Sequence, residues 1–243
     1  MKRMKAILVL VATVAFMLSP VLSSGFSGFT ADQFPIPQND PPIQPTGWTF
    51  AVIWSVIYLW LLVMAVYGLV KRADNPDWDR VRWPLIASLA IGATWIPVAN
   101  LSPLWATLLI WAMLGTALWA LIRTPARDGL WLQAPIGLYA GWLTAAANVG
   151  TAVVATGYGA VPVQPVHAAF LIVASWIALT LARMGPGYPF YVLAMIWASF
   201  GILVDNLQAG RWIFAALAGV ILLVLIPTGW QNYTRAKARL AKA

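Results

Sequence analysis

Long apolar runs separated by short polar segments dominate the chain. A helix needs about 17 to 25 mostly apolar residues to cross the hydrocarbon core of a bilayer, and the sequence contains eight such runs. They are continuously apolar, whereas the strands of a membrane barrel would alternate in polarity over about ten residues. The pattern therefore predicts an all-α integral membrane protein with about eight helices. The expected spans are 6–23, 48–70, 83–101, 104–122, 132–157, 164–182, 189–206 and 212–230.

The polar segments between these runs are rich in Pro, Gly and charged residues, which is typical of turns. Segments 71–82 and 123–129 are clear examples. Segment 25–47 contains no Lys or Arg and carries several prolines between Pro35 and Pro45, which favours extended polyproline geometry. It is either a spacer or a lid over the outer mouth of the bundle, and the spacer is the simpler interpretation.

Composition supports a membrane protein. Hydrophobic residues make up 61% of the chain and charged residues 9%, whereas soluble proteins carry about 25% charged residues. The net charge is +8, but the basic residues form short clusters between apolar runs instead of one patch, so no nucleic-acid partner is expected. The expected surroundings are membrane lipid. The chain has no cysteine, which excludes disulfides and thiolate metal sites.

The distribution of Lys and Arg predicts the orientation in the membrane, because short cytoplasmic loops collect basic residues. If the N-terminus is cytoplasmic, all but one of the 15 Lys and Arg residues fall on the cytoplasmic side, and only Arg211 falls outside. Eight crossings then place both termini in the cytoplasm. This bias and the lack of an organelle presequence favour a bacterial inner membrane.

The spans contain few groups that could support coupled transport or catalysis. No Lys lies inside a span, which excludes a retinal Schiff base. No Asp, Glu, Lys or Arg lies near the middle of one, which argues against an ion-coupled pump. Asp205 and Arg211 are expected to pair across an outer turn. His167 is either a haem ligand or, more simply, a hydrogen-bonded residue near the interface. No catalytic set or metal cluster is evident.

The 15 tryptophans are the most distinctive feature of the sequence. Some lie at the ends of the predicted spans, where indole rings form interfacial belts. The deeper ones carry N–H groups that need partners inside the bundle. They either line a cavity for a flat, apolar, conjugated ligand or pack the helices against small residues. The deeper tryptophans are Trp54, Trp60, Trp95, Trp111, Trp119, Trp142, Trp176 and Trp197.

Three segments resemble motifs of the TspO/MBR family, the tryptophan-rich sensory proteins and translocator proteins. The sequence PTGWTFAVIWSVIY at 45–58 is similar to the first-helix signature of that family. GATWIPVA at 92–99 and LYAGWLTAAAN at 138–148 are similar to parts of its second and fifth helices. The resemblance covers about residues 45–157. The positions that carry it are Pro45, Trp48, Phe50, Trp54, Tyr58, Trp95, Pro97, Trp142 and Asn148.

The resemblance implies a five-helix bundle over residues 48–182. This chain would add an N-terminal helix or signal peptide at 1–24, a Pro-rich outer loop at 25–47, further C-terminal helices at 183–230 and a basic cytoplasmic tail at 231–243. The basic start, short apolar stretch and small residues fit either a retained helix or a cleaved signal peptide. The likeness to longer family members favours the retained helix.

The resemblance also implies a function. Members of this family bind tetrapyrroles such as protoporphyrin IX, or sterol-like apolar molecules, in a pocket inside the bundle. The expected ligand is protoporphyrin IX, haem or a similar molecule, in a sensory, regulatory or translocation role. No cofactor is obligatory, and enzymatic activity would be at most light-dependent porphyrin breakdown. The implied ligand-binding residues are Trp48, Trp54, Tyr58, Trp95, Trp142 and Asn148.

Two positions depart from the family pattern. Gly92 stands where typical members carry an Asn. Asn148 follows Trp142 by six residues, whereas the family spacing is eight. Two residues correspond to about 200° of helix, so the Asn148 side chain would face elsewhere. Both departures concern the amides that would contact a ligand.

A passive transporter or permease for an apolar solute is the alternative interpretation. It would need an internal repeat with broken helices at matching positions. Pro97 lies inside a span, but the C-terminal half shows no matching residue. The Gly- and Ala-rich segment 132–157 is a candidate seam for a homodimer, since small residues let membrane helices approach closely.

Overall fold

A computed structural model describes residues 2–26, 28–125, 127–185 and 187–241. Within these residues, eight helices are long and apolar enough to cross a membrane, and there is no strand. Both findings confirm the predicted all-α membrane architecture. The long helices are α1 (Lys2–Leu22), α2 (Gly47–Lys71), α3 (Pro76–Leu101), α4 (Pro103–Ile122), α5 (Ala134–Gly157), α6 (Val163–Met184), α7 (Pro189–Gln208) and α8 (Trp212–Leu240). The connections contain two short helical turns, η1 (Ala31–Gln33) and η2 (Gly129–Gln133).

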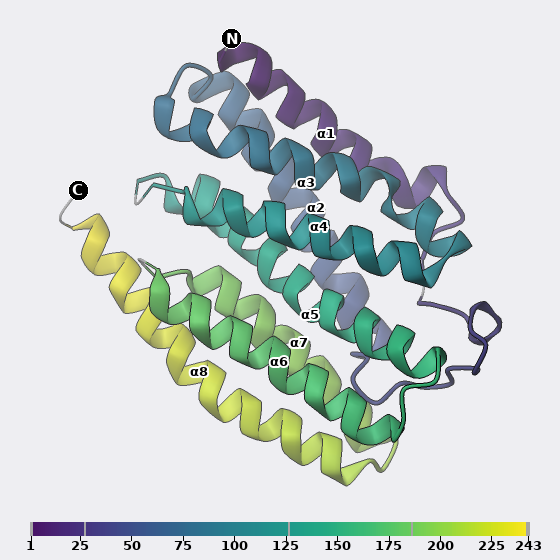
Figure 1. Cartoon of the computed structure of the whole chain (residues 1–243). Helices are drawn as coiled ribbons and strands as arrows, with labels where there is room; N and C mark the ends of the chain where they lie inside the picture. Colours follow the sequence, from purple (N-terminus) through teal and green to yellow (C-terminus); the bar gives the residue numbers. More distant parts are fainter. Residues whose placement is uncertain (1, 27, 126, 186, 242–243) are drawn as a thin grey trace.

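The helices lie side by side and alternate in direction (Figure 1). The first and last helices have their chain ends at the same end of the bundle, and the long connection between α1 and α2 lies at the opposite end (Figure 1). Apart from Arg211, the Lys and Arg residues that the structure describes lie at or near the end with the termini. One end of the molecule is therefore strongly basic.

Two helices extend beyond the predicted apolar spans. α3 begins at Pro76 because Asn75 caps it: the Asn75 side chain accepts hydrogen bonds from the backbone N–H groups of Asp77 and Trp78, at 2.8 and 3.2 Å. Pro and acidic residues are favourable in a first helical turn. α8 continues to Leu240, so most of the basic tail is helical. Hydropathy marks only the apolar part of a helix, and polar turns lengthen both of these.

α5 is the central helix of the bundle. It packs against α2, α4, α6 and α7, and most of its residues are buried. A Cβ atom on Gly141 would overlap the Tyr191 carbonyl and lie 2.8 Å from the Ala194 Cβ, so the backbones of α5 and α7 are in close contact. The Gly- and Ala-rich face therefore packs inside the chain. The candidate homodimer seam on this face is occupied by α7 of the same chain.

α1 packs against both α2 and α3. Arg82, which is 3% exposed, ties the three helices together at the end with the termini. Its Nη1 donates to the carbonyl oxygens of Lys2 and Ala73 at 2.9 and 2.7 Å, and its Nη2 donates to that of Arg72 at 2.8 Å. One buried guanidinium thus holds the start of α1 to the turn between α2 and α3. α1 is a wall of the bundle.

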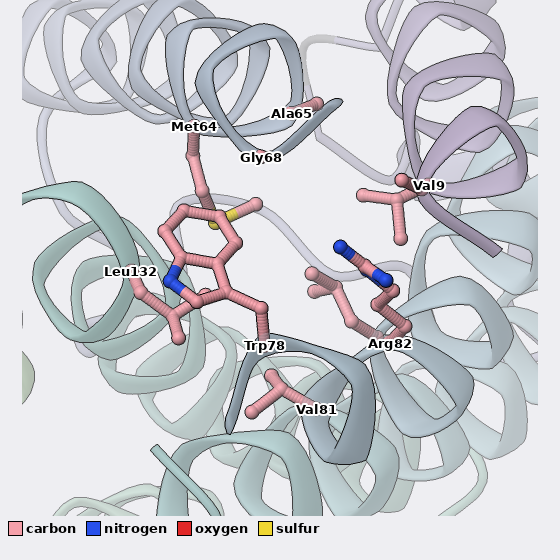
Figure 2. A pocket seen from close by; sticks show the side chains of 10 residues that line it. Val9, Met64, Ala65, Gly68, Trp78, Val81, Arg82 and Leu132 are labelled. Atoms are coloured by element: carbon pink, nitrogen blue, oxygen red, sulfur yellow. The ribbon is translucent and has the colours of Figure 1, made fainter. Parts of the chain in front are cut away.

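A small cavity of about 20 Å³ lies beside this contact. Figure 2 shows the Trp78 indole next to Met64 and Gly68 of α2, with Arg82 on the side of Val9 of α1. A Cβ on Gly68 would lie 2.7 Å from the Trp78 ring, so the glycine makes room for the indole. A space of this size holds about one water molecule. It is a packing defect at the α1–α2–α3 contact and too small for an organic ligand.

Candidate ligand cavity

A cavity of about 480 Å³ lies in the half of the bundle away from the termini. Its walls come from α1, α2, α3, α4, α5 and α7, and none of the lining residues comes from α6. Small-molecule sites typically measure about 300–1,000 Å³, so the space is large enough for an organic ligand. Its aromatic lining residues are Phe16, Phe26, Phe29, Phe50, Trp54, Tyr58, Trp95 and Trp142.

Trp54 and Tyr58 form the aromatic face of α2. They are four residues apart, so the helical repeat places both side chains on one side of the helix. Their rings stack with centroids 5.3 Å apart. Trp142 of α5 meets Trp54 edge-on at 6.4 Å and Phe50 edge-on at 6.0 Å. These four rings form a continuous wall that offers ring faces and edges to a flat apolar molecule.

Phe16 of α1 forms part of the inner end of the cavity. Its ring packs edge-on against Tyr58 and Tyr139, with centroids 5.0 and 5.7 Å away. Gly92 of α3 makes room for it, because a Cβ there would lie 2.7 Å from the Phe16 ring. The departure from the family pattern at Gly92 thus has a packing reason. An Asn side chain at this position would overlap the Phe16 ring.

Trp95 of α3 lines another side of the cavity. Its Nε1 donates to the Ala106 carbonyl of α4 at 2.8 Å, and its ring meets Phe26 edge-on at 4.8 Å. The hydrogen bond satisfies the indole N–H where lipid offers no partner. It also fixes the orientation of the ring, so Trp95 presents a preset apolar surface to the cavity.

The segment between α1 and α2 covers the outer end of the cavity. It is fastened to helix ends: the Gln33 side chain donates to the Ala99 carbonyl at 2.9 Å, and the Ile36 N–H donates to the Gly157 carbonyl at 3.0 Å. The spacer interpretation was therefore wrong, because the segment forms part of the cavity wall. Its lining residues are Phe26, Gly28, Phe29, Gln44 and Pro45.

The lining is almost entirely apolar. Among the described residues that line the cavity, none is Lys, Arg, Asp, Glu or His. Besides indole N–H groups, the polar side chains are Gln44, Thr107 and Tyr58. The Thr107 hydroxyl already donates to the Pro103 carbonyl at 2.8 Å. The site can therefore offer stacking surfaces and a few neutral hydrogen-bonding groups.

The structure brings four of the six predicted ligand-binding residues to the cavity. They come from three helices, α2, α3 and α5, that carry the three segments of family resemblance. Within this group, Trp142 is 2% exposed, and its Nε1 has no hydrogen-bond partner among the described residues. The four residues are Trp54, Tyr58, Trp95 and Trp142.

The other two predicted residues, Trp48 and Asn148, lie outside the cavity lining. Trp48 is 50% exposed and packs edge-on against Trp197 of α7, with centroids 5.8 Å apart. Asn148 is 1% exposed and donates to the Thr144 carbonyl at 2.8 Å. Each lies six residues from a cavity tryptophan on the same helix. Six residues are about 240° of helix, so each faces another direction.

The other deep tryptophans lie outside the cavity lining. Trp119 and Trp176 are 46% and 65% exposed on the outside of the bundle. Three more donate their N–H groups to neighbouring helices or turns, as predicted for deep indoles, whereas the buried Trp142 N–H has no partner among the described residues. These bonds run from Trp60 to the Leu130 carbonyl (3.2 Å), from Trp111 to Thr151 Oγ1 (2.9 Å) and from Trp197 to the Thr49 carbonyl (2.9 Å).

His167 is fully buried and lies outside the cavity lining. Its Nε2 lies 3.2 Å from Thr156 Oγ1, which confirms the interpretation of a hydrogen-bonded ring. In the described part of the chain, no group of three or more His, Cys, Asp or Glu side chains is placed to hold a metal ion. Asp205 pairs with Arg211 as predicted.

Several lining residues could not be predicted from the sequence. Phe16 of α1 and Ala198 and Ile202 of α7 come from helices outside the segments of family resemblance. They belong to no motif, and the hydropathy of a fully apolar helix does not show which side faces a cavity. The one sequence feature that pointed to such a residue was Gly92. A glycine close to Trp95 on α3 leaves space that an aromatic ring of another helix can fill.

The fold and the cavity define an integral membrane protein of the helical-bundle class with an aromatic internal site. The model of the TSPO-like protein family matches residues 6–229, most of the chain, and the chain belongs to this family. The match extends on both sides of the segments of motif resemblance and includes almost all of α1 and the whole of α7. No curated protein and no solved structure matches the chain.

Proposed function

We propose that this TSPO-like membrane protein binds a flat, apolar ligand, such as a tetrapyrrole, in the cavity. The observation that carries the proposal is the wall of Phe50, Trp54, Tyr58 and Trp142 beside an internal space of about 480 Å³. Protein interiors are close-packed. Rings that served only to pack helices would fill the space between them, whereas these rings border an opening of ligand size.

Stacking and shape supply the specificity of this site. An apolar ligand that enters from the bilayer leaves an equally apolar solvent, so the hydrophobic effect contributes little. Each well-placed aromatic contact contributes about 0.5–1.5 kcal/mol beyond simple burial. A planar conjugated molecule can stack on several of these rings at once, whereas a flexible acyl chain has no π face to stack.

The position of the cavity supports a binding and sensory role in preference to passage through the bundle. The cavity occupies one half of the bundle, whereas the other half is filled by buried side chains such as Leu61, Met64 and Leu121. α3 runs through Pro97 as one helix, without the break expected of a transporter repeat. A ligand in the cavity would contact Phe16 of α1 as well as residues of the TspO-like motif helices α2, α3 and α5.

Titration of the protein in lipid nanodiscs tests the proposal. Protoporphyrin IX and its dimethyl ester are added separately, and binding is followed by tryptophan quenching and pigment absorbance. We expect saturable binding of at least one pigment, weakened about threefold to tenfold by Trp54→Phe or Trp142→Phe, because a smaller ring loses stacking area. Trp119→Phe is the matched control, since Trp119 is 46% exposed on the outside of the bundle.

Two results would contradict the proposal. One is that neither pigment binds saturably to a protein that retains its helical content. The other is that Trp119→Phe weakens binding as much as Trp54→Phe does, because quenching would then reflect pigment in the surrounding lipid.

A further inference from the structure

We propose that the cavity selects an uncharged ligand and discriminates against ligands that carry ionised carboxylates. The inference rests on the proposed function and names the class of ligand taken by that same site. According to this inference, the cavity binds a ring system whose carboxyl groups are absent or esterified more tightly than a tetrapyrrole dicarboxylate with the same planar core.

The lining of the cavity offers no counter-ion. The Gln44 amide and the Thr107 hydroxyl are uncharged, and none of the described lining residues is Lys, Arg or His. Burying an ionised carboxylate without an opposite charge is strongly unfavourable in an apolar environment. Neutral hydrogen-bonding groups of this kind suit keto, ester or hydroxyl oxygens.

The outer end of the molecule would repel an anion that approached the cavity there. The charged residues of this end are Asp32, Asp40, Asp205 and Arg211, which leaves two net negative charges. Arg211 is fully engaged: its guanidinium bonds Asp40 Oδ2 at 2.6 Å and also bonds Asp205. The cation at this end is therefore already neutralised, and the remaining field disfavours carboxylates.

The basic end of the bundle is too far away to compensate. Lys71, at the end of α2, follows the cavity residue Tyr58 by thirteen residues, which corresponds to about 20 Å along the helix. Arg82 is the buried cation at that end, and its guanidinium already donates hydrogen bonds to three backbone carbonyl groups. A carboxylate in the cavity would find no partner among these groups.

The ligand inferred from this chemistry is a planar conjugated ring system without an ionised group. It would carry one or two neutral oxygens that can bond the Gln44 amide at the outer end. Its ring would lie against Trp54 and Tyr58, and its remaining edge would meet Phe16 and Trp142. Lipid-soluble ring compounds with keto or ester groups have this character.

Comparison of protoporphyrin IX with its dimethyl ester tests the inference, because the two pigments share one macrocycle and differ in ionisation. Empty nanodiscs, measured alongside, give the partition of each pigment into lipid. After this correction we expect the ester to bind wild-type protein at least about tenfold more tightly than the acid at pH 7.5. Binding of the acid should strengthen as the pH falls toward 5 and its carboxylates become protonated, whereas binding of the ester should stay constant.

A charge-introducing variant provides the second arm. Gln44→Lys places a cation at the cavity and should reduce the preference for the ester by about fivefold or more, because the new ammonium pairs with a carboxylate. Gln208→Lys is the matched control: it adds the same charge on an exposed position at the same end, outside the lining. It should leave the preference unchanged.

The outcomes separate the two proposals. Tighter ester binding that Gln44→Lys reduces, and Gln208→Lys does not, supports the inference. Equal or tighter binding of the acid, still weakened by Trp54→Phe, overturns the inference and leaves the proposed function standing. Absence of saturable binding of both pigments overturns the proposed function and the inference with it.

Discussion

Single glycines decide how closely rings and helices meet in this bundle. Gly92 leaves the space that Phe16 fills at the inner end of the cavity, and Gly141 allows the backbone of α7 to approach α5 at Tyr191. In both cases the missing Cβ is what permits the contact. The shape of the cavity thus depends on residues that contribute no side chain to it.

Gly141→Ala tests the close contact between α5 and α7. The added methyl group would overlap the Tyr191 carbonyl and lie 2.8 Å from the Ala194 Cβ. We expect the free energy of unfolding to fall by about 1–3 kcal/mol, measured as a lower thermal midpoint in detergent. Gly219→Ala on α8 is the control, because nothing lies within 4 Å of its added Cβ and Ala is the better helix former. Equal midpoints for both variants would show that the two helices can separate without cost.

Sequence patterns predicted the cavity residues that share a helix face. Trp54 and Tyr58 follow the four-residue spacing of one helix side, and both reach the cavity. Asn148, which the family resemblance implied as a ligand-binding residue, lies outside the lining, consistent with its departure by two residues from the family spacing. Phe16 could not be predicted in this way, because its position depends on a contact with α3 that is more than 70 residues away in the chain.

At the scale of elements, one acidic residue connects the ends of α2, α3 and η2 at the basic end of the bundle. Asp128, just before η2, accepts hydrogen bonds from Arg72 Nε at 2.7 Å and from Trp78 Nε1 at 2.9 Å. Arg72 follows α2 and Trp78 lies in the first turn of α3. The Arg72 guanidinium lowers the pKa of the Asp128 carboxyl from its ordinary value of 3.8, and the Trp78 hydrogen bond acts in the same direction.

This lowered pKa predicts a loss of stability in acid. A carboxyl whose pKa is lower in the folded than in the unfolded state stabilises the fold above its unfolded pKa, and the contribution disappears as the pH falls through the folded pKa. We expect the thermal midpoint of the wild type to decrease when the pH is lowered below about 4. Asp128→Asn should lose about 1 kcal/mol at pH 7 and show a flatter acid limb. Asn is the suitable replacement because residue 128 has φ of +61°, which Asn tolerates.

The control is Asp77→Asn, whose side chain is 48% exposed in its pair with Arg80. It should follow the wild-type acid limb closely. If Asp128→Asn and wild type lose stability in parallel below pH 4, the acid sensitivity arises at another carboxylate.

Hydropathy predicted the existence of all eight long helices found in the described residues but only part of their boundaries. α3 gains its first turns from polar residues capped by Asn75, and α8 continues to Leu240 through a basic segment. Capping and continued helical hydrogen bonding extend a helix beyond its apolar residues, and a transfer scale does not register either effect. The fold of the outer segment was equally hidden, since it depends on carbonyl groups of two distant helix ends.

At the scale of the whole molecule, the eight apolar helices of the described residues and the basic end followed from the sequence, whereas the assembly of the cavity walls did not. The segments of motif resemblance cover about residues 45–157, but the cavity also needs Phe16 of α1 and Ala198 of α7. Long-range packing assembles these walls, and no local pattern records it. The predicted unit 48–182 therefore does not enclose the site by itself, and its α6 contributes no lining residue.

The distribution of basic residues predicts that the end with both termini faces the cytoplasm. Because the chain has no cysteine, single cysteines can be placed freely. We expect Thr234→Cys in α8 to react with a membrane-impermeant maleimide only after the cells are permeabilised, and Gln208→Cys to react in intact cells. Both positions are exposed. The opposite labelling pattern would show that the basic end faces outward.

For the proposed uncharged ligand, a neutral cavity would make occupancy independent of the membrane voltage. Moving one elementary charge across the bilayer against 100 mV changes its energy by about 2.3 kcal/mol, which is enough to alter a binding equilibrium many-fold. An uncharged ligand that enters a lining without Lys, Arg, Asp, Glu or His among its described residues moves no charge through that field. If the proposed uncharged ligand binds there, its occupancy would follow its amount in the lipid in the same way whether the cell is energised or not.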